Sequence, residues 1–567
     1  MEVKLSSSAN DFITPSLACV KPVQIDRTKK NRVLALEGLQ DEAAADAAPK
    51  VAKVTLNDCL ACAGCITSAE TVLVEQQSIG EFERMLAADA YDLVVVSLST
   101  AARAAIAVHL DLGLRETHGR LTHFLKGIGC DRVLDCGVAG YLGLLQTAAE
   151  FIFRFRAASA ATAAAAASAP ASAPPSASAS VTASPVAQAL PLPLLTSSCP
   201  GWVCYAEKTH GEGVLRHLSR VKSPQQIAGT LVKYAYAASC GVPPERVCHV
   251  AVMPCFDKKL EASRDDFFNA EAGPHGSRDV DCVLSSAELL QLCEQRGAPR
   301  LMDTLVSTPD ADPPLSALHA AVHATPLSAP DAASGSTDAD GDFDVRDVDI
   351  SDAAGDGGGD GDGGDGSDGG GSSSSGSVDG SVADVGFDGF SYAAPGASGG
   401  SADFVFRCAS RELFGIDPAD GPLPWVAGRN NDLQELTLEQ NGVIVLRFAR
   451  AYGFRNIQNI VRRVKSGKSP YHFVELMACP GGCANGGGQP RPPPLEAATR
   501  TAAVEAKLVN AAETRRVSPF DQPCVRGLYA EGAFLEGGPL GVACQRHLIT
   551  AFHAVDPTKQ NPLTVSW

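Results

Sequence analysis

The feature that most constrains this chain is a glycine-rich loop, residues 475–489, that carries the cysteines Cys479 and Cys483. Its glycines lack a Cβ and permit positive φ angles, so backbone N–H groups can approach a bulky, negatively charged group closely. Cysteine thiolates are soft ligands that bind zinc and the irons of iron-sulfur clusters. A flexible turn with two incidental thiols is the alternative. The ordered pattern favours a loop that binds a metal cluster.

Two further cysteines each follow an apolar run. Cys199 comes after residues 191–195, and Cys255 comes after residues 247–252. Short apolar runs of this kind predict buried strands, and sites in open α/β sheets assemble at the carboxyl ends of strands. We therefore expect both cysteines to converge with the pair in the glycine-rich loop. Four thiolates are one full ligand set for a cubane cluster.

These three segments resemble the signature loops of the iron-only hydrogenases, and the likeness covers most of residues 90–300 and 400–490. Residues 199–210 and 447–459 are more similar still to the hydrogenase-like cytosolic iron-sulfur assembly factors. That family also includes the nuclear prelamin A recognition factors. The resemblance implies an α/β, two-lobed core with a 4Fe-4S cluster between the lobes. The ligands it implies are Cys199, Cys255, Cys479 and Cys483.

The N-terminal region contains a second cysteine pattern. Cys59, Cys62 and Cys65 have C-x2-C-x2-C spacing, which lets one loop wrap three corners of a cubane, as in ferredoxins. No fourth cysteine follows within residues 66–69. The resemblance assigns that position to the upstream Cys19 and implies a small ferredoxin-like module, hence two 4Fe-4S clusters in all. Structural zinc is the competing metal, because four cysteines also suit a tetrahedral zinc ion.

Two low-complexity segments interrupt the pattern of strands and helices. Residues 157–190 are mostly Ala, Ser and Pro, and residues 306–402 are rich in Gly and Asp, so we expect both to be disordered. Strands are expected at 92–97 and 442–446, and helices at 285–296 and 457–464. The expected domains are an N-terminal iron-sulfur module at 1–85, a first α/β lobe at 86–156 and 191–235, a second at 236–305 and 403–490, and a C-terminal region with an exposed tail at 491–567.

Charge and composition exclude several classes of function. The net charge is -18, but 15 Asp and one Arg lie between Asp338 and Asp388, a net of -14, so about -4 remains for everything else. A nearly neutral remainder argues against direct nucleic acid binding by a broad basic face. No apolar run reaches the roughly 18 residues that a membrane span needs, and the start has no secretory pattern. We expect reduced thiols and a cytoplasmic protein, with the nucleus as a second location.

Several residues that the hydrogenases use for proton transfer differ here. A cysteine precedes the first cluster ligand in those enzymes, whereas this chain has Ser198, whose hydroxyl stays protonated at physiological pH. Thr147 replaces one acidic residue of the expected relay, while Glu150 and Ser219 match the family pattern. Pro480 stands where active hydrogenases commonly have a histidine. The resemblance therefore implies a hydrogenase-like protein without catalysis.

Other residues of the hydrogenase pocket persist, namely Met253, Met477, Lys258 and Lys259. In a hydrogenase the methionines pack against a two-iron unit and Lys258 holds one of its ligands. The interpretation that we favour is that these side chains pack the cubane and pair with Glu261 or with solvent.

The chain ends in Val565, Ser566 and Trp567, which is similar to the terminal motif of proteins bound by the cytosolic iron-sulfur targeting complex. A terminal carboxylate plus one buried aromatic ring is a compact recognition element. The predicted function is a non-catalytic iron-sulfur assembly factor that links scaffold NTPases to the targeting complex and its apoprotein clients. An iron-only hydrogenase and a prelamin A tail-binding protein are the alternatives.

Overall fold

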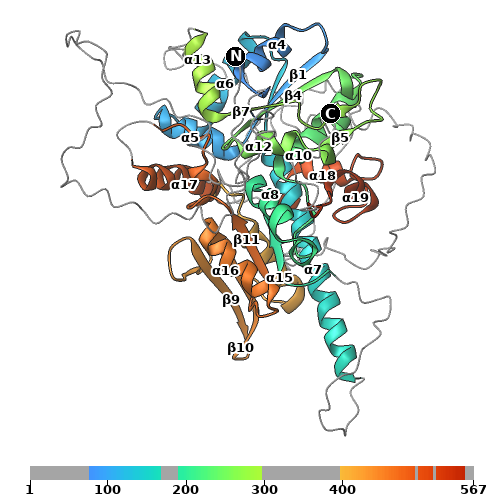
Figure 1. The fold of residues 1–567 in the computed structure, drawn as a ribbon, viewed down its shortest axis with the longest axis vertical. Coiled ribbons are helices and arrows are strands. Elements are labelled where there is room, and N and C mark those ends of the chain that lie inside the picture. The colour runs from blue at the N-terminus through green and yellow to red at the C-terminus, as the bar shows by residue number, and fades with distance from the viewer. Residues whose placement is uncertain are drawn as a thin grey trace, which may run out of the picture.

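The computed structural model describes residues 74, 76–167, 190–296, 396–419, 421–491, 496–514 and 519–555. Cys19, Cys59, Cys62, Cys65 and Trp567 therefore lie outside the described residues. Two β-sheets form the body of the molecule, one in the upper half of Figure 1 and one in the lower half.

Sheet A is fully parallel and has the strand order β2-β1-β4-β7. Its strands read as nearly continuous apolar runs because helices cover both faces of a parallel sheet. The strands are β1 (Leu93–Leu98), β2 (Arg132–Asp135), β4 (Val247–Met253) and β7 (Cys282–Ser285). The helices around it include α4 (Ile79–Ala87), α5 (Thr100–His109), α6 (Leu114–Gly127) and α13 (Ser286–Gln295). Phe82 of α4 is fully buried in this core, so part of the expected N-terminal module packs on sheet A.

Sheet B is mixed and has the strand order β3-β11-β10-β9-β8. The parallel strands are β3 (Leu194–Thr196), β11 (Phe473–Met477) and β10 (Val443–Tyr452); β9 (Leu433–Gln440) and β8 (Val426–Ala427) continue the sheet antiparallel. Helix α15 (Ser401–Phe414) covers one face, where Phe406, Phe448 and Phe473 pack together. The apolar side of α16 (Phe454–Lys465) contributes Ile457 and Ile460 to the core of the other face.

Helices from several parts of the chain connect the two sheets. The long helix α7 (Gly137–Ala167) packs against α10 (Pro224–Thr230) near sheet A and against α15 beside sheet B. The other helices here are α8 (Pro200–Thr209), α9 (Glu212–Leu215), α11 (Ala237–Ser239), α12 (Asp257–Ala262), α17 (Ala497–Thr514), α18 (Pro523–Tyr529) and α19 (Val542–Leu548). Short elements complete the described part: η2 (Leu231–Tyr236), η3 (Pro244–Arg246), η4 (Asp265–Phe267), β5 (Phe268–Asn269), β6 (Ser277–Arg278), η6 (Gly482–Asn485) and η7 (Pro519–Asp521).

The predicted strands and helices are confirmed, since β1, β10, α13 and α16 lie at the expected positions. The predicted division into lobes is wrong, because strands from the two expected lobes pair with each other. β4 pairs with β1 in sheet A, and β3 pairs with β11 in sheet B. Hydrophobic runs identify strands, but their partners depend on the long crossover connections between them.

Two predicted boundaries of the low-complexity segments also need correction. Helix α7 continues to Ala167, because the alanine-rich stretch that follows residue 156 favours helix and contains no proline before Pro170. The acidic segment ends earlier than expected, since residues 396–402 are ordered and lead into α15.

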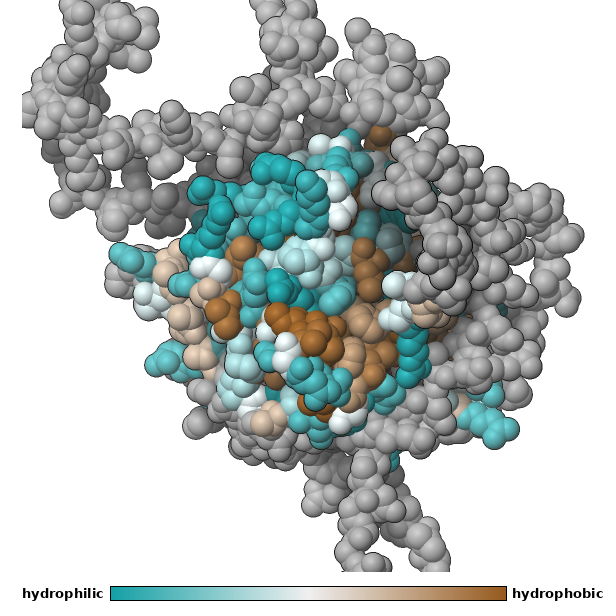
Figure 2. Space-filling model, turned by 90° about the horizontal axis from the view of Figure 1, so that it is seen from below, coloured by the Kyte–Doolittle hydropathy of each residue, from teal (hydrophilic) through white to brown (hydrophobic). Residues whose placement is uncertain are grey.

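The surface of the described part mixes polar and apolar side chains. Seen from below, apolar residues gather near the centre of the described surface (Figure 2). Val443 and Ile444, next to the β9–β10 turn, are exposed. Among the helices that the structure describes, none is long and apolar enough to cross a membrane.

Candidate metal centre

Three of the predicted cysteines follow the carboxyl ends of parallel strands. Cys199 comes after β3 and is the N-cap residue of α8, Cys255 comes two residues after β4, and Cys479 comes two residues after β11. β3 and β11 are neighbours in sheet B, whereas β4 belongs to sheet A. The carboxyl ends of strands from both sheets therefore meet at one place, as expected for a site in an α/β fold.

The fourth cysteine, Cys483, lies in the short helix η6, within the glycine-rich loop. All four cysteines line one cavity, whose volume is about 140 Å³. The same cavity is lined by Met253, Met477 and Ser198. The structure thus brings together the four cysteines that the sequence predicted, although they come from segments far apart in the chain.

The electrostatics of this cavity are those of grouped thiols, of which Cys199 is buried and the other three are half-buried. Burial raises the pKa of Cys483 to about 12. Burial, the carboxylate of Asp257 and the three neighbouring cysteines raise the pKa of Cys255 well above its ordinary value. Such thiols ionise only when a positively charged centre stabilises the thiolates, and metal binding then releases their protons.

Two glycines allow the ligand-bearing loops to approach each other. Gly482 has φ +71°, and a Cβ there would lie 2.2 Å from the hydroxyl oxygen of Ser398. Gly486 has a negative φ of -57°, but a Cβ there would lie 2.3 Å from the carbonyl oxygen of Pro254, next to Cys255. Gly486 therefore allows close contact between two cysteine loops, whereas the sequence had suggested that it allows close approach to the bound group.

Residues 396–402 form part of the site that the sequence analysis missed. The hydroxyl oxygen of Ser398 accepts a 3.1 Å hydrogen bond from the backbone N–H of Cys483. Fully buried Glu475 accepts 2.8 Å hydrogen bonds from the backbone N–H of Ala402 and from the hydroxyl of Tyr452. These bonds attach the segment to the cysteine loop. Residues 396–402 are similar in composition to the Gly- and Ser-rich stretch before them. The sequence feature that could have predicted their order is the helical pattern that starts at Ser401.

The C-terminal region also supports the cysteine loop. Arg500 of α17 donates a 3.0 Å hydrogen bond to the side-chain oxygen of Asn485 in η6, and Glu505 accepts from the backbone N–H of Ala397. The family likeness found in the sequence stopped at residue 490, so it gave this helix no function.

The two retained lysines have different partners in the structure. Lys258 lines the cavity, and its ammonium group pairs with Glu261 and donates a 2.9 Å hydrogen bond to Ser223. The ammonium of Lys259 points elsewhere and bonds to Glu288 at 2.7 Å. The predicted pairing of Lys258 with Glu261 is confirmed.

Of the residues at the expected proton-relay positions, Glu150 and Ser219 bond to each other, whereas Thr147 bonds within its own helix. The hydroxyl of Thr147 donates a 2.7 Å hydrogen bond to the carbonyl of Gly143 in its own helix. The carboxylate of Glu150 forms an ion pair with Arg154 at 2.5 Å and accepts from the hydroxyl of Ser219 at 2.6 Å. These contacts hold α7 against the segment around residue 218, since Arg154 also donates to the carbonyl of Leu218.

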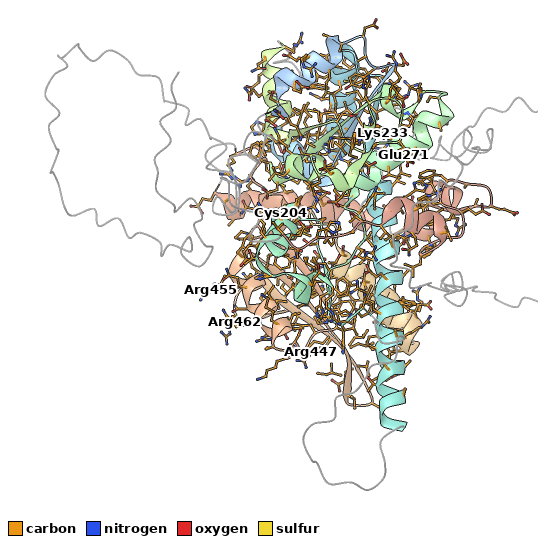
Figure 3. The ribbon with its side chains drawn as sticks, turned by 45° about the vertical axis from the view of Figure 1, so that its right-hand side comes forward. Cys204, Lys233, Glu271, Arg447, Arg455 and Arg462 are labelled. Atoms are coloured by element: carbon orange, nitrogen blue, oxygen red, sulfur yellow. The ribbon has the colours of Figure 1, made fainter. Side chains whose placement is uncertain are left out.

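Zinc and a cubane differ in how far apart their thiolate ligands lie. Within the described ranges, no three His, Cys, Asp or Glu side chains are placed to hold one metal ion. Thiolates around one zinc lie at most about 4.6 Å apart, twice the Zn–S distance of roughly 2.3 Å. A cubane binds one thiolate at each of four irons and so accepts a wider set. Cys204 lies on α8 and does not line the cavity (Figure 3).

Comparisons with known proteins agree with this geometry. Residues 92–309 and 381–487 match the family described as iron only hydrogenase large subunit, C-terminal domain. A solved structure of apo [FeFe]-hydrogenase HydA1 from Chlamydomonas reinhardtii superimposes with a TM-score of 0.56 at 22% identity, over 84% of this chain and 98% of that one. The fold is therefore that of the iron-only hydrogenases.

Curated relatives define the branch of this family. Cytosolic iron-sulfur assembly component 3 of Pongo abelii is 38% identical over 98% of this chain and 97% of its own length. Protein NAR1 of Arabidopsis thaliana is 34% identical over 96% of this chain and 95% of its own length. This chain belongs to the family of the cytosolic iron-sulfur assembly component 3 proteins.

Proposed function

We propose that this chain is a non-catalytic 4Fe-4S protein of the cytosolic iron-sulfur protein assembly machinery. It would link scaffold NTPases to the targeting complex and so serve the maturation of cytosolic and nuclear iron-sulfur proteins. The observation that carries the proposal is the convergence of four cysteines on one buried cavity in a member of this family.

In this proposal Cys199, Cys255, Cys479 and Cys483 hold one cubane. The cluster supplies the positive charge that the buried thiolates require and can store one electron. The chain's own residues position it. Met253 and Met477 supply apolar contacts at the cavity wall, and Ser398 fixes the backbone of Cys483 by its hydrogen bond. Lys258 faces the same cavity, where its charge favours the ionised form of Cys199 and Cys483.

The contacts of the former relay residues support the non-catalytic part of the proposal. Ser198 lines the cavity with a hydroxyl that, unlike a thiol, does not ionise near neutral pH. Thr147 and Glu150 are engaged in bonds that stabilise α7. The relative from Pongo abelii is named for cytosolic iron-sulfur assembly, not for hydrogen turnover or lamin binding. A retained cavity with both methionines and Lys258 is the observation that keeps hydrogenase activity as the alternative to test.

The N-terminal cysteines, Cys19, Cys59, Cys62 and Cys65, are proposed to hold the second cubane. The first residues that the structure describes after them are attached firmly to the core. The side-chain amide of Gln77 donates to the carbonyl of Lys259 at 2.8 Å, and its oxygen accepts from the backbone of Val283 at 3.1 Å. The proposed location is the cytoplasm, with the nucleus as a second location. The proposed contact with the targeting complex is made through Trp567.

The proposal is tested by anaerobic reconstitution followed by iron and sulfide counts and by paramagnetic resonance of the reduced protein. Two cubanes require about eight irons and eight sulfides per chain. Cys62→Ala should remove only the N-terminal signal, whereas Cys483→Ala should remove the signal of the buried site and also lower the stability of the chain, because that site joins the two sheets.

A matched control is Cys204→Ala, which changes a cysteine on the same helix as the Cys199 loop without touching the cavity. It should leave both signals intact. A count near four irons, or zinc in place of iron at the N-terminus, contradicts the two-cluster proposal.

A further inference from the structure

One face of the molecule carries a concentrated positive charge that the proposed function does not use. Helix α16 and the turn after it expose Arg455, Arg462, Arg463, Lys465 and Lys468. No Asp or Glu occurs between Gly453 and Val474. Figure 3 shows Arg455 and Arg462 on one outer side of the molecule.

These cations have no acidic partner within the part of the chain that the structure describes. Arg462 makes a 3.4 Å hydrogen bond with Asn459, and no ion pair joins any of the five to a described carboxylate. The carboxylate of Glu435, on the adjacent strand β9, accepts a 2.6 Å hydrogen bond from the hydroxyl of Tyr471. The charges therefore face solvent as a group, on a chain whose negative charge is concentrated in residues 338–388.

Helix stability does not explain the whole face. Cations in the last turn, such as Arg462, Arg463 and Lys465, interact favourably with the helix dipole. Arg455 lies in the first turn, where the dipole disfavours a cation and where α16 has no acidic residue. Arg455 and Arg462 are seven positions apart, so they lie on one side of the helix about 10.5 Å from each other. A ligand with spaced negative charges matches that arrangement.

The chain itself contains such a ligand. Residues 338–388 have 15 Asp and one Arg. The chain re-enters the described structure at Gly396, and Ser398 lies beside the N-terminal end of α16. Ser398 and Tyr452 both approach the Cβ position of Gly482, at 2.2 and 3.2 Å, and Tyr452 directly precedes the N-cap residue Gly453.

The linking residues are long enough for contact. The eight positions from Asp388 to Gly396 span up to about 26 Å, and the twelve residues of α16 extend about 18 Å. The whole helix is thus within reach of the acidic segment by length of chain.

We propose that the acidic segment 338–388 binds the basic face of α16 in the same molecule. Arginine suits this contact because its planar guanidinium binds carboxylates through two parallel hydrogen bonds. Single exposed ion pairs are weak, but tethering gives the segment an effective concentration on the order of millimolar. The face is short. The exposed and half-buried residues between its cations are Gln458, Asn459, Ser466 and Gly467, with no aromatic ring on which a nucleic acid base could stack.

The test is the rate at which Lys465 and Lys468 are acetylated in the full chain, followed by mass spectrometry. The wild type is compared with a chain in which every Asp from 338 to 388 is replaced by Asn. At low salt the wild type should react at least about threefold more slowly, which corresponds to a tethered segment that covers the lysines about two thirds of the time. In about 1 M salt, where charges are screened beyond roughly 3 Å, the two rates should become equal.

Two arginine variants complete the design. Arg455→Gln combined with Arg462→Gln should raise both lysine rates to those of the Asn-substituted chain. The matched control, Arg220→Gln combined with Arg546→Gln, changes two exposed arginines on other elements and should leave the protection intact. Equal rates for the wild type and the Asn-substituted chain at low salt would overturn the proposal. Protection that arises only after polyaspartate or polyuridylate is added would also overturn it, since the binding partner is then another molecule.

Discussion

Gly486→Ala tests whether the buried site depends on close contact between two cysteine loops. The added methyl would lie 2.3 Å from the carbonyl oxygen of Pro254 and 3.0 Å from its carbonyl carbon, and both are backbone atoms that cannot rotate away. Ordinary contact begins at 3.4 Å, so the loops must separate by about 1 Å. Ligand distances in metal sites tolerate only about 0.2 Å, and overpacking of this kind costs about 1–3 kcal/mol.

The expected result is a chain that keeps all eight proposed ligands yet loses the cluster between Cys255 and Cys483. After anaerobic reconstitution, Gly486→Ala should contain about four irons where the wild type contains about eight. The paramagnetic signal of the N-terminal cluster should remain. Denaturation of the cluster-free chain should show the loss of about 1–3 kcal/mol directly.

Gly119→Ala is the matched control, because a Cβ at this position in α6 meets nothing within 4 Å. It should keep the full iron content and gain about 0.5–1 kcal/mol, since alanine favours a helix over glycine. If Gly486→Ala binds as much iron as the wild type and unfolds at the same denaturant concentration, the close contact of the loops has no energetic importance and the argument is refuted.

Three other outcomes are expected. The reconstituted protein should evolve no hydrogen from reduced viologen, and Ser198→Cys alone should not create activity because Thr147 still replaces an acidic relay residue; turnover that disappears in Cys255→Ala would identify a hydrogenase instead. Deletion of Trp567 should weaken binding to the targeting complex by about 2 kcal/mol, or roughly thirtyfold, without changing iron content, and binding by the truncated and C-terminally amidated chains at wild-type strength would remove the tail from the proposal. Burial lowers the pKa of His249 from 6.5 to about 4, so the folded chain favours the neutral imidazole. The stability that neutral His249 contributes is therefore complete above pH 6.5 and is lost as the pH falls toward 4. In urea unfolding of the cluster-free chain, protonation of this side chain should make the free energy of unfolding about 2 kcal/mol lower at pH 5 than at pH 7. A His249→Gln chain whose stability has the same pH dependence as the wild type would contradict this expectation.

The sequence alone predicted which cysteines would come together at one site. Cys199, Cys255 and Cys479 could be placed after strands because short apolar runs end just before them, and the carboxyl ends of strands are where sites form. Local patterns also predicted α13 and α16, since helical periodicity and capping depend on residues close in the chain. The fold class followed from these patterns together with the family resemblance.

The tertiary structure alone decided how the segments pair and what supports the site. β3 joins β11 and β4 joins β1, against the expected lobes, because strand order depends on contacts between segments far apart in sequence. Ser398 bonds to Cys483, and the position of Gly486 is limited by Pro254, whose carbonyl belongs to a loop more than two hundred residues away in the chain. A sequence pattern records which residues are apolar, flexible or able to bind metal, whereas close contact between distant backbones exists only after folding.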